Sequence, residues 1–340
     1  MRSARLRVPG PIASGPLELI EVDSPVPGSG QIVVEVAVCG VCRTDIQLCE
    51  GDLEARRLPI TPGHQIVGRV VERGEDVDRP VGTRVGVTWL GGACWTCEFC
   101  RSGRENLCRQ AVFTGWDHDG GFADAVIVED AVAFDLPDGF ADEDAAPLLC
   151  GGVIGFRSLR VSGVQPGQRL GLFGFGASAT VAIQVARHWG CDVHVATRSE
   201  ADRERAVALG AASVGGYGDP PPSPLHAAVT FAPVGDVVVN ALAALERGGT
   251  VAVNAIHLDR VPEFPYELLW WERNLRSVAN VTRSDVRSLL DLAAEIPIVT
   301  QHRSFALDDV DEAMRAAAAG RVQGAALVVP DPARLGAVTA

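Results

Sequence analysis

The 340-residue sequence has no lysine, so all thirty of its permanently basic side chains are arginines. A lysine amine forms Schiff bases with carbonyl substrates, and it can serve as a general base or as a phosphate ligand. Its absence excludes all three roles for a lysine side chain. Any positively charged grip on a phosphate group must therefore come from arginine.

The sequence also lacks an excess of positive charge and a long apolar run. Its formal net charge of −13 argues against nucleic acid and anionic membranes as partners. The N-terminal stretch MRSARLRVPGP is not apolar, so we expect no signal peptide, no transmembrane helix and a cytoplasmic location. Disulfides rarely persist in the cytoplasm, and nine is an odd number of cysteines, which favours metal ligands and free thiols over a full disulfide set.

Two sequence textures divide a chain that is too long for one ordinary core. Up to about residue 150, short runs rich in Val and Ile predict strands: QIVVEVAV, QIVGRVVERG, RVGVTWL and FADAVIV. From about residue 165, expected strands and helices alternate: QRLGLFGFG, ASATVAIQVARHW, DVHVAT, EADRERAVALG, AAVTFA, VGDVVVNALAALERG and TVAVNAI. We therefore expect an α/β protein whose second part is a parallel sheet covered by helices. Two amphipathic helices within 285–318 and a closing strand at GAALVV complete the expected elements.

A glycine-rich turn opens the alternating part. Gly174 and Gly176 follow a predicted strand, and Ala179 lies in the first turn of the next helix. The first glycine permits a tight turn, the second lets the backbone approach a pyrophosphate, and the alanine lets helix and strand pack closely. Such a turn can also occur without a phosphate ligand, but its setting between a strand and a helix favours a dinucleotide site.

The end of the next strand bears on which dinucleotide binds. The fingerprint normally ends about 20 residues on with an acid that grips the ribose 2′-hydroxyl. Here that position is Thr197, followed by Arg198 and Ser199, with Arg203 nearby. An acid would repel a 2′-phosphate, whereas arginines and hydroxyls would bind it. We favour NADP(H) over NAD(H); the alternative is a solvated loop whose charges have no consequence.

Four cysteines lie close together in GGACWTCEFCRSGRENLC, at positions Cys94, Cys97, Cys100 and Cys108. This spacing can bring four thiolates around one tetrahedral zinc ion. Disulfides are the alternative, and the expected compartment disfavours them. A zinc ion with four thiolate ligands offers no open position to a substrate, so we expect a structural role.

A second set of metal-ligand types is dispersed along the chain. GVCRTD carries Cys42, PGHQIVG carries His64, and PLLCGG carries Cys150. Spacing alone does not unite them, and each could be an ordinary core residue. However, these motifs occur in order with the four-cysteine segment, GFGASA and IVTQHRSFALDDVDEAM. Together they resemble the zinc-dependent medium-chain alcohol dehydrogenases over essentially the whole chain, most closely the bacterial propanol-preferring or broad-substrate type.

The resemblance implies a GroES-like catalytic domain at 1–150 and 282–340, and a Rossmann domain at 151–281. It implies that Cys42, His64 and Cys150 bind a catalytic zinc and leave its fourth position open. With the four-cysteine site, that makes two zinc ions per chain. Hydride would pass between the nicotinamide and a small alcohol, aldehyde or imine. A homodimer or homotetramer is expected.

The same resemblance gives roles to three neighbours of the first cysteine. Asp45 would orient the histidine ligand, Arg43 would contact the cofactor pyrophosphate, and Thr44 would pass the proton onward. The substrate would lie near a set of side chains that includes two tryptophans: Cys49, Leu53, Trp89, Leu90 and Trp116. Family members that act on ethanol often have tryptophan at the first two of these positions, so the smaller residues here suggest room for a larger substrate.

Two positions depart from the family pattern. Gln47 replaces a histidine that ends the proton path, and Gln65 replaces a glutamate beside the zinc ligand His64. Glutamine does not change protonation at working pH. Ordinary variation within an alcohol dehydrogenase is our first interpretation. A specialised reductase of an iminium or a conjugated enal is the second, and a non-catalytic protein that binds zinc and cofactor is the third.

Overall fold

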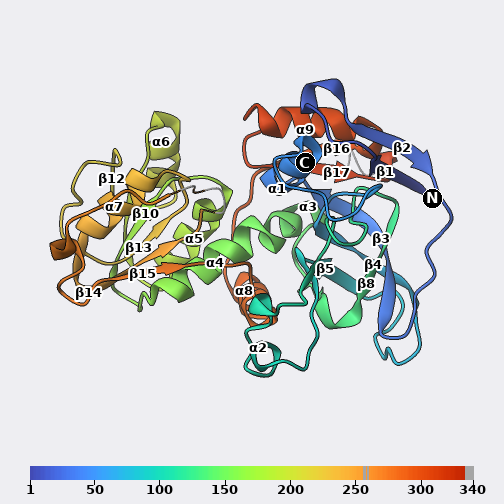
Figure 1. Ribbon diagram of the computed structural model, residues 1–340, viewed down its shortest axis with the longest axis horizontal. Coiled ribbons are helices and arrows are strands. Elements are labelled where there is room, and N and C mark those ends of the chain that lie inside the picture. Colours follow the sequence, from blue (N-terminus) through green and yellow to red (C-terminus); the bar gives the residue numbers. More distant parts are fainter. Residues whose placement is uncertain (256–257, 259, 334–340) are drawn as a thin grey trace. The chain divides into compact units, whose positions relative to one another are not determined.

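The computed structural model, shown in Figure 1, describes residues 1–255, 258 and 260–333. These residues separate into two units. The first comprises Met1–Cys150, Thr282–Glu295 and the described part of Val299–Ala340, and the second comprises Gly151–Val281 and Ile296–Ile298. In the described part of the chain, no helix combines the length and the apolar character needed to cross a membrane.

The first unit is built on a mainly antiparallel seven-stranded sheet. Its strands, in spatial order, are β16 (His302–Ala306), β17 (Ala325–Val329), β3 (Gln31–Gly40), β4 (Gln65–Arg73), β5 (Arg84–Val87) and β9 (Ala133–Asp135), while β8 (Ala125–Glu129) pairs with β3. The central strand β3 is buried at eight of its ten positions, as its Val- and Ile-rich sequence requires. Two small sheets pair β1 (Arg2–Leu6) with β2 (Leu17–Glu21), and β6 (Leu90–Gly92) with β7 (Val112–Phe113).

Helices and short 3₁₀ turns of this unit lie between and after its strands. The α-helices are α1 (Arg43–Glu50), α2 (Glu98–Arg101), α3 (Asp142–Ala145), α8 (Arg283–Glu295) and α9 (Val310–Ala318). The 3₁₀ turns are η1 (Ile12–Ser14), η2 (Glu105–Leu107), η3 (Asp130–Val132), η4 (Ala146–Leu149) and η6 (Leu307–Asp309). Helix α9 has an apolar face, and its Val310, Ala313 and Met314 are buried in the core of this unit.

The start of α8 is held by its own residues and by the four-cysteine segment. Thr282 and Asp285 cap the helix reciprocally: the Asp285 carboxylate accepts from the Thr282 N–H at 2.9 Å, and the Asp285 N–H donates to the Thr282 hydroxyl at 3.2 Å. The buried carboxylate of Glu105 accepts from the Arg283 N–H at 2.7 Å, across 178 residues of sequence. The Arg283 guanidinium lies 4.4 Å from the centre of the Trp95 ring. The return of the chain to the first unit is therefore fixed at the four-cysteine segment.

The second unit is a six-stranded parallel sheet with helices. The strands lie in the order β12 (Ser213–Gly215), β11 (Asp192–Ala196), β10 (Arg169–Phe173), β13 (Leu225–Thr230), β14 (Leu245–Val253) and β15 (Asn274–Ser277). Its helical elements are α4 (Gly151–Ser162), α5 (Ala177–His188), α6 (Glu200–Ala208), α7 (Gly235–Ala243) and η5 (Tyr266–Leu268). This is the 3-2-1-4-5-6 order of the doubly wound dinucleotide-binding fold, and it confirms the predicted α/β class.

Some expected elements differ in detail. The run RVGVTWL is not one strand, because β5 ends at Val87 and β6 begins at Leu90. Trp89 lies in the break between them and is only partly buried. Strand β16 was not expected from the sequence. The last residue of TVAVNAI, Ile256, lies outside the described residues.

Candidate zinc and cofactor sites

Three dispersed ligand types come together in the first unit. Cys42 is the N-cap of α1, His64 directly precedes β4, and Cys150 follows η4. The Cys42 and Cys150 sulfurs are 3.7 Å apart, and the His64 Nε2 atom lies 3.4 Å from the Cys150 sulfur. Both cysteines are partly exposed, whereas the histidine is buried.

These distances fit a tetrahedral zinc ion. Zinc–sulfur bonds of about 2.3 Å and a zinc–nitrogen bond of about 2.0 Å place two sulfurs about 3.8 Å apart and a sulfur about 3.5 Å from a nitrogen. The observed separations of 3.7 and 3.4 Å agree with both values. A disulfide would need a sulfur separation of about 2.0 Å, so the two thiols are not bonded. Two sulfurs and one imidazole leave a fourth coordination position, which is the arrangement of catalytic zinc sites.

Asp45 fixes the geometry of this cluster. Its carboxylate accepts from the backbone N–H of Cys42 at 2.7 Å and from that of Gly63 at 3.1 Å. The same carboxylate lies 3.1 Å from His64 Nδ1, so the Nε2 atom is left to face the sulfurs. Asp45 is 2% exposed, and α1 places it one turn inside the helix from Cys42. The arrangement is that of a carboxylate that orients a metal-binding histidine.

The electrostatics of the cluster favour a cation at its centre. A hydrogen bond from Cys150 and the nearby His64 hold the pKa of Cys42 well below its usual range, although burial opposes this shift. Burial also disfavours a charged His64, but the Asp45 carboxylate and Cys42 raise the pKa of His64 to about 10. The Cys42 thiolate and the Asp45 carboxylate thus place negative charge around His64, which favours a proton on the imidazole. A divalent cation would satisfy the same charges.

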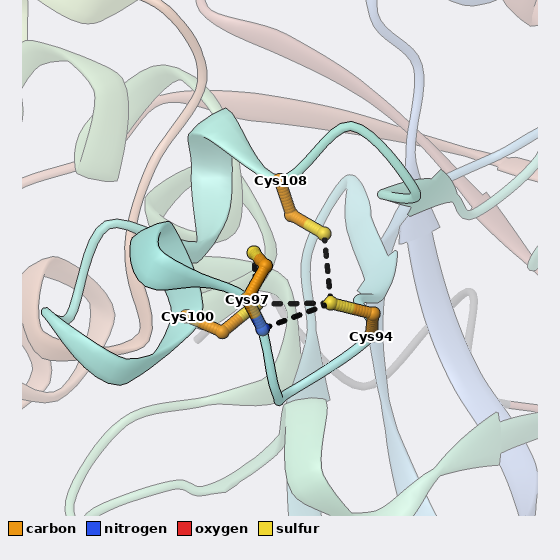
Figure 2. A group of neighbouring side chains, drawn as sticks. All are labelled: Cys94, Cys97, Cys100 and Cys108. Carbon is orange, nitrogen blue, oxygen red and sulfur yellow. Dashed lines mark hydrogen bonds between the residues drawn. The ribbon is translucent and has the colours of Figure 1, made fainter.

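The four neighbouring cysteines form a second cluster, drawn in Figure 2. The sulfur of Cys94 lies 3.9 Å from that of Cys100 and 3.5 Å from that of Cys108, and the Cys97 and Cys100 sulfurs are 3.6 Å apart. Backbone N–H groups of Thr96 and Cys97 lower the pKa of Cys94 to about 6. These separations also fit one tetrahedral zinc, and the four sulfurs leave no ligand position for a substrate. None of the nine cysteines, all of which lie in the described residues, forms a disulfide.

The two unusual glutamines are buried beside the first cluster. Gln47 is 6% exposed, and its Oε1 atom has no hydrogen-bond partner in the described structure. Gln65 is 5% exposed and covers Gly40, where a Cβ atom would lie 2.9 Å from the glutamine Cδ. The Thr44 hydroxyl lies 3.7 Å from the Cys42 sulfur, and Arg43 is exposed at the first position of α1.

The glycine-rich turn connects β10 to α5 in the second unit. Gly174 has φ +97°, and a Cβ atom there would lie 2.9 Å from the Ala232 backbone nitrogen, so only glycine fits without strain. Gly176 is the exposed N-cap of α5, and a Cβ atom there would meet nothing within 4 Å. Ala179 is fully buried. Because Gly176 has no side chain, nothing at this position covers the first N–H groups of α5. An anion site at a helix N-terminus requires such free N–H groups.

The residues after β11 form hydrogen bonds and an ion pair mainly with one another. Ser199 caps α6 by accepting from the Asp202 N–H at 3.2 Å. Arg203 donates to the Thr197 carbonyl at 3.0 Å and pairs with Glu200 at 2.9 Å. Thr197 is 3% exposed.

Two further arginines, Arg198 and Arg205, lie close to this strand end and differ in their contacts. Arg198 is exposed and lies two residues after the end of β11. Sequence reasoning missed Arg205, which donates to the Phe175 carbonyl of the glycine turn at 2.7 Å and so ties α6 to that turn. This contact could not be predicted from local sequence patterns, because the two residues are 30 positions apart.

The five expected pocket residues fall into two groups. Cys49 and Leu90 are buried in the first unit, with exposed fractions of 0% and 2%. Leu53, Trp89 and Trp116 are partly exposed. The Trp89 ring centre is 6.2 Å from that of His64 and 5.9 Å from that of Trp116. The structure thus places Trp89 beside the histidine of the first cluster, and Trp116 stacks on Trp89.

Comparisons with known proteins agree with this arrangement. The family model of the alcohol dehydrogenase GroES-like domain matches residues 28–138. The chain is 45% identical over 336 residues to a probable alcohol dehydrogenase AdhA of Mycobacterium tuberculosis (strain CDC 1551 / Oshkosh), covering 97% of both chains. It is 30% identical over 318 residues to an alcohol dehydrogenase of Geobacillus stearothermophilus, covering 91% of this chain and 94% of the other.

Solved structures share the fold. A cobalt- and zinc-bound thermostable alcohol dehydrogenase of Pyrobaculum aerophilum superposes with a TM-score of 0.87 at 24% identity, covering 97% of this chain and 99% of that one. A structure of CAD from Helicobacter pylori complexed with NADP(H) gives a TM-score of 0.85 at 20% identity, covering 96% and 97%. The full-length sequence match confirms the resemblance seen in the motifs. The chain belongs to the zinc-dependent medium-chain alcohol dehydrogenase family.

Proposed function

We propose that the protein interconverts small alcohols and aldehydes, using zinc and a nicotinamide cofactor. The reaction is aldehyde + NAD(P)H + H⁺ giving alcohol + NAD(P)⁺, with hydride moving between the cofactor and the carbonyl carbon. The cluster of Cys42, His64 and Cys150, with its free coordination position, carries the proposal. In this scheme the first unit is the catalytic domain, the second binds the dinucleotide, and the enzyme acts in the cytoplasm.

The cluster and its neighbours have distinct tasks. Zinc held by the three ligands would act as a Lewis acid that polarises the carbonyl group. Asp45 keeps His64 in one orientation and one tautomer. Thr44, beside Cys42, offers a hydroxyl that accepts and donates a proton. Gln47 does not titrate, so it cannot exchange a proton with Thr44, and a proton path beyond Thr44 would need another group, such as a cofactor hydroxyl or water.

A panel of aldehydes, enals and cyclic imines, assayed with NADH and NADPH, tests the proposal. Aldehydes should be reduced, and His64→Gln should abolish turnover while cofactor binding, measured by fluorescence titration, stays near the wild-type level. His118→Gln is the control, since this partly exposed histidine lies in the same unit outside the cluster. Reduction of imines alone, or full activity of His64→Gln, would refute the proposed reaction.

We infer two zinc ions per chain, one in each cysteine cluster. The fit of both sulfur sets to tetrahedral geometry supports this number. Elemental analysis of protein purified without chelator should give close to two zinc ions per chain. A value of one or fewer in fully folded protein would contradict the inference.

We also infer a preference for NADP(H) over NAD(H). Thr197 replaces the acid of NAD-specific sites, and Arg198 is exposed beside it. Ser199 is the N-cap of α6 and Arg203 lies in the first turn of that helix, so a hydroxyl and a guanidinium are close to Arg198. The Arg203 guanidinium donates to the Thr197 carbonyl and pairs with Glu200, and it would have to exchange Glu200 for a 2′-phosphate. A lower dissociation constant for NADH than for NADPH would refute this inference.

A homo-oligomer is the proposed assembly, formed through the second unit. Tyr266, Trp270 and Trp271 are 68%, 59% and 45% exposed, and their rings contact one another with centres 5.8 and 6.4 Å apart. They directly precede β15, the edge strand of the parallel sheet. Exposed aromatic clusters beside an open sheet edge favour association with a second copy. Light scattering should give at least a dimer, and Trp270→Glu should lower the mass, whereas Val207→Glu on α6 should not.

A further inference from the structure

A chain of polar contacts joins the glycine-rich turn to the residues after β11. The Nη2 atom of Arg205, on α6, donates to the Phe175 carbonyl and to the Asp202 carboxylate, both at 2.7 Å. The other carboxylate oxygen of Asp202 accepts from the Thr197 hydroxyl at 3.4 Å, and the Thr197 hydroxyl oxygen accepts from the Ser199 N–H at 3.4 Å. One guanidinium therefore contacts both parts of the second unit that would bind a dinucleotide.

Arg205 fixes the orientation of one peptide group in the turn. The Phe175 carbonyl and the Gly176 N–H belong to the same trans peptide, so they point in opposite directions. Because the carbonyl is held toward α6, the Gly176 N–H points away from that helix. Gly176 has no side chain that limits its own backbone, so this peptide depends on an external hold. The Arg205 guanidinium also lies 5.5 Å from the centre of the Phe175 ring, which adds a second contact to the same residue.

Arg205 also balances the charge of an acid beside the end of β11. The Asp202 carboxylate contacts Thr197, the residue at the position where NAD-specific sites have an acid. An unpaired carboxylate here would repel a 2′-phosphate, as an acid at position 197 itself would. The two paired side chains are only 26% and 27% exposed, so solvent screens the pair incompletely.

We propose that Arg205 is a positioning residue of the dinucleotide site. It holds the Phe175–Gly176 peptide of the turn in one orientation, and it neutralises Asp202, which would otherwise repel a 2′-phosphate. This inference rests on the proposed binding of NADP(H) by the second unit, and it adds a residue that helps to set the choice between NADPH and NADH. Arg205 acts through Phe175 and Asp202 rather than on the cofactor itself.

Calorimetric titration of the full-length, zinc-loaded protein with NADPH and with NADH separates the two effects. In Arg205→Gln the dissociation constant for NADH should rise about threefold, because the peptide of the turn loses one hydrogen bond that holds it. The constant for NADPH should rise by a further factor of about three to ten, the size expected for one partly exposed charge that acts on a phosphate. Salt at about 0.5 M should reduce this additional loss, because it screens exposed charges.

Asp202→Asn removes the acidic charge and keeps the shape of the side chain. It should lower the dissociation constant for NADPH, because the Arg205 charge is then unbalanced, and change that for NADH less than about twofold. In the double variant Asp202→Asn/Arg205→Gln, the ratio of the two constants should return to within about twofold of the wild-type ratio. Both constants should nevertheless stay above the wild-type values, because the turn is still not held. Asp202→Asn alone also tests the charge balance if Arg205→Gln fails to fold.

Arg169→Gln is the matched control in the same unit. Arg169 is the first residue of β10, at the end of the strand opposite to the glycine-rich turn. Its guanidinium also donates to a backbone carbonyl, that of Pro224, at 2.6 Å. Its removal costs the same kind of hydrogen bond, so both dissociation constants should stay within about twofold of the wild type.

The outcomes separate this inference from the proposed function. Absence of dinucleotide binding to the folded wild type would refute the proposed cofactor function, and tighter binding of NADH than of NADPH would refute the preference for NADP(H). Equal losses for both cofactors in Arg205→Gln would refute the charge balance. An unchanged constant for NADH in Arg205→Gln, or equal losses in Arg169→Gln, would refute the hold on the turn. Weaker NADH binding by Asp202→Asn would overturn the role given to Asp202, since it would then bind the ribose itself.

Discussion

Asp45→Asn tests whether a buried carboxylate holds the three zinc ligands in place. The substitution preserves the shape of the side chain but replaces one acceptor oxygen by an amide NH₂ group. In the structure, one Asp45 oxygen accepts from the Cys42 N–H. The other oxygen accepts from the Gly63 N–H and lies 3.1 Å from His64 Nδ1. In either amide orientation a donor must therefore face a donor at 2.7 to 3.1 Å. At least one hydrogen bond is therefore lost and replaced by a repulsive donor–donor contact.

The expected size of the effect follows from these contacts. A hydrogen bond to a charged group contributes about 1.5–3 kcal/mol, and loss of a carboxylate behind a histidine ligand typically weakens metal binding about 10-fold to 100-fold. We therefore expect the zinc affinity of the open cluster to fall within that range. The four-cysteine cluster contains no contact with Asp45, so its zinc should be retained and serves as an internal reference.

Competition with a chromophoric chelator measures both affinities in one titration. Asp45→Asn should release the zinc ion of the open cluster at a clearly lower chelator concentration than the wild type does. The zinc ion of the four-cysteine cluster should be released at the same concentration in both proteins. Asp52→Asn is the control, because it makes the same change in charge at an exposed position just after α1. A folded Asp45→Asn protein that holds both zinc ions as tightly as the wild type would refute the assignment of Asp45.

Cys100→Ser should reduce the zinc content to one ion per chain and lower the Tm, while a folded fraction keeps its turnover; retention of two ions would contradict a structural zinc. Thr197→Asp should weaken NADPH binding about tenfold or more in calorimetric titration, because an acid repels the 2′-phosphate that a charge-assisted contact would hold. Burial lowers the pKa of His194, so the wild type should lose stability as the pH falls below the unfolded value of about 6.5, where the unfolded chain takes up the proton first. His194→Gln should therefore flatten the fall of Tm between pH 7.5 and 5.5, whereas His188→Gln, at an exposed position, should follow the wild type; identical curves for all three proteins would contradict a shifted His194.

The fold could be predicted where its determinants are local. The alternation of apolar strands and amphipathic helices after residue 165, and the turn at Gly174, follow from short-range patterns, and the structure contains the corresponding parallel sheet. RVGVTWL could not be divided in this way, because Thr88 and Trp89, which lie at the break, are residue types that favour strands and are not turn formers. The break at Trp89 depends on the packing of its ring against His64 and Trp116, which lie far away in sequence.

The candidate sites show the same division. The four-cysteine cluster lies within one short segment, so its spacing alone indicates a metal. Cys42, His64 and Cys150 approach one another only when β3, β4 and η4 are in place, and the sequence suggested their grouping only through the family resemblance. Arg205 and Phe175 form no pattern at all, because their contact depends on α6 and the glycine-rich turn meeting in space.

The hydrogen bond from Arg283 to Glu105 makes the four-cysteine segment part of a cooperative folding unit. Glu105 lies between two of the four cysteines, so the loop that would bind the second zinc holds the acceptor that fixes the first turn of α8. Loss of zinc there would free that acceptor and lower the free energy of local opening at the start of α8. Amide hydrogen exchange in the first turn of α8 would then report the metal occupancy of a loop 178 residues earlier in the chain.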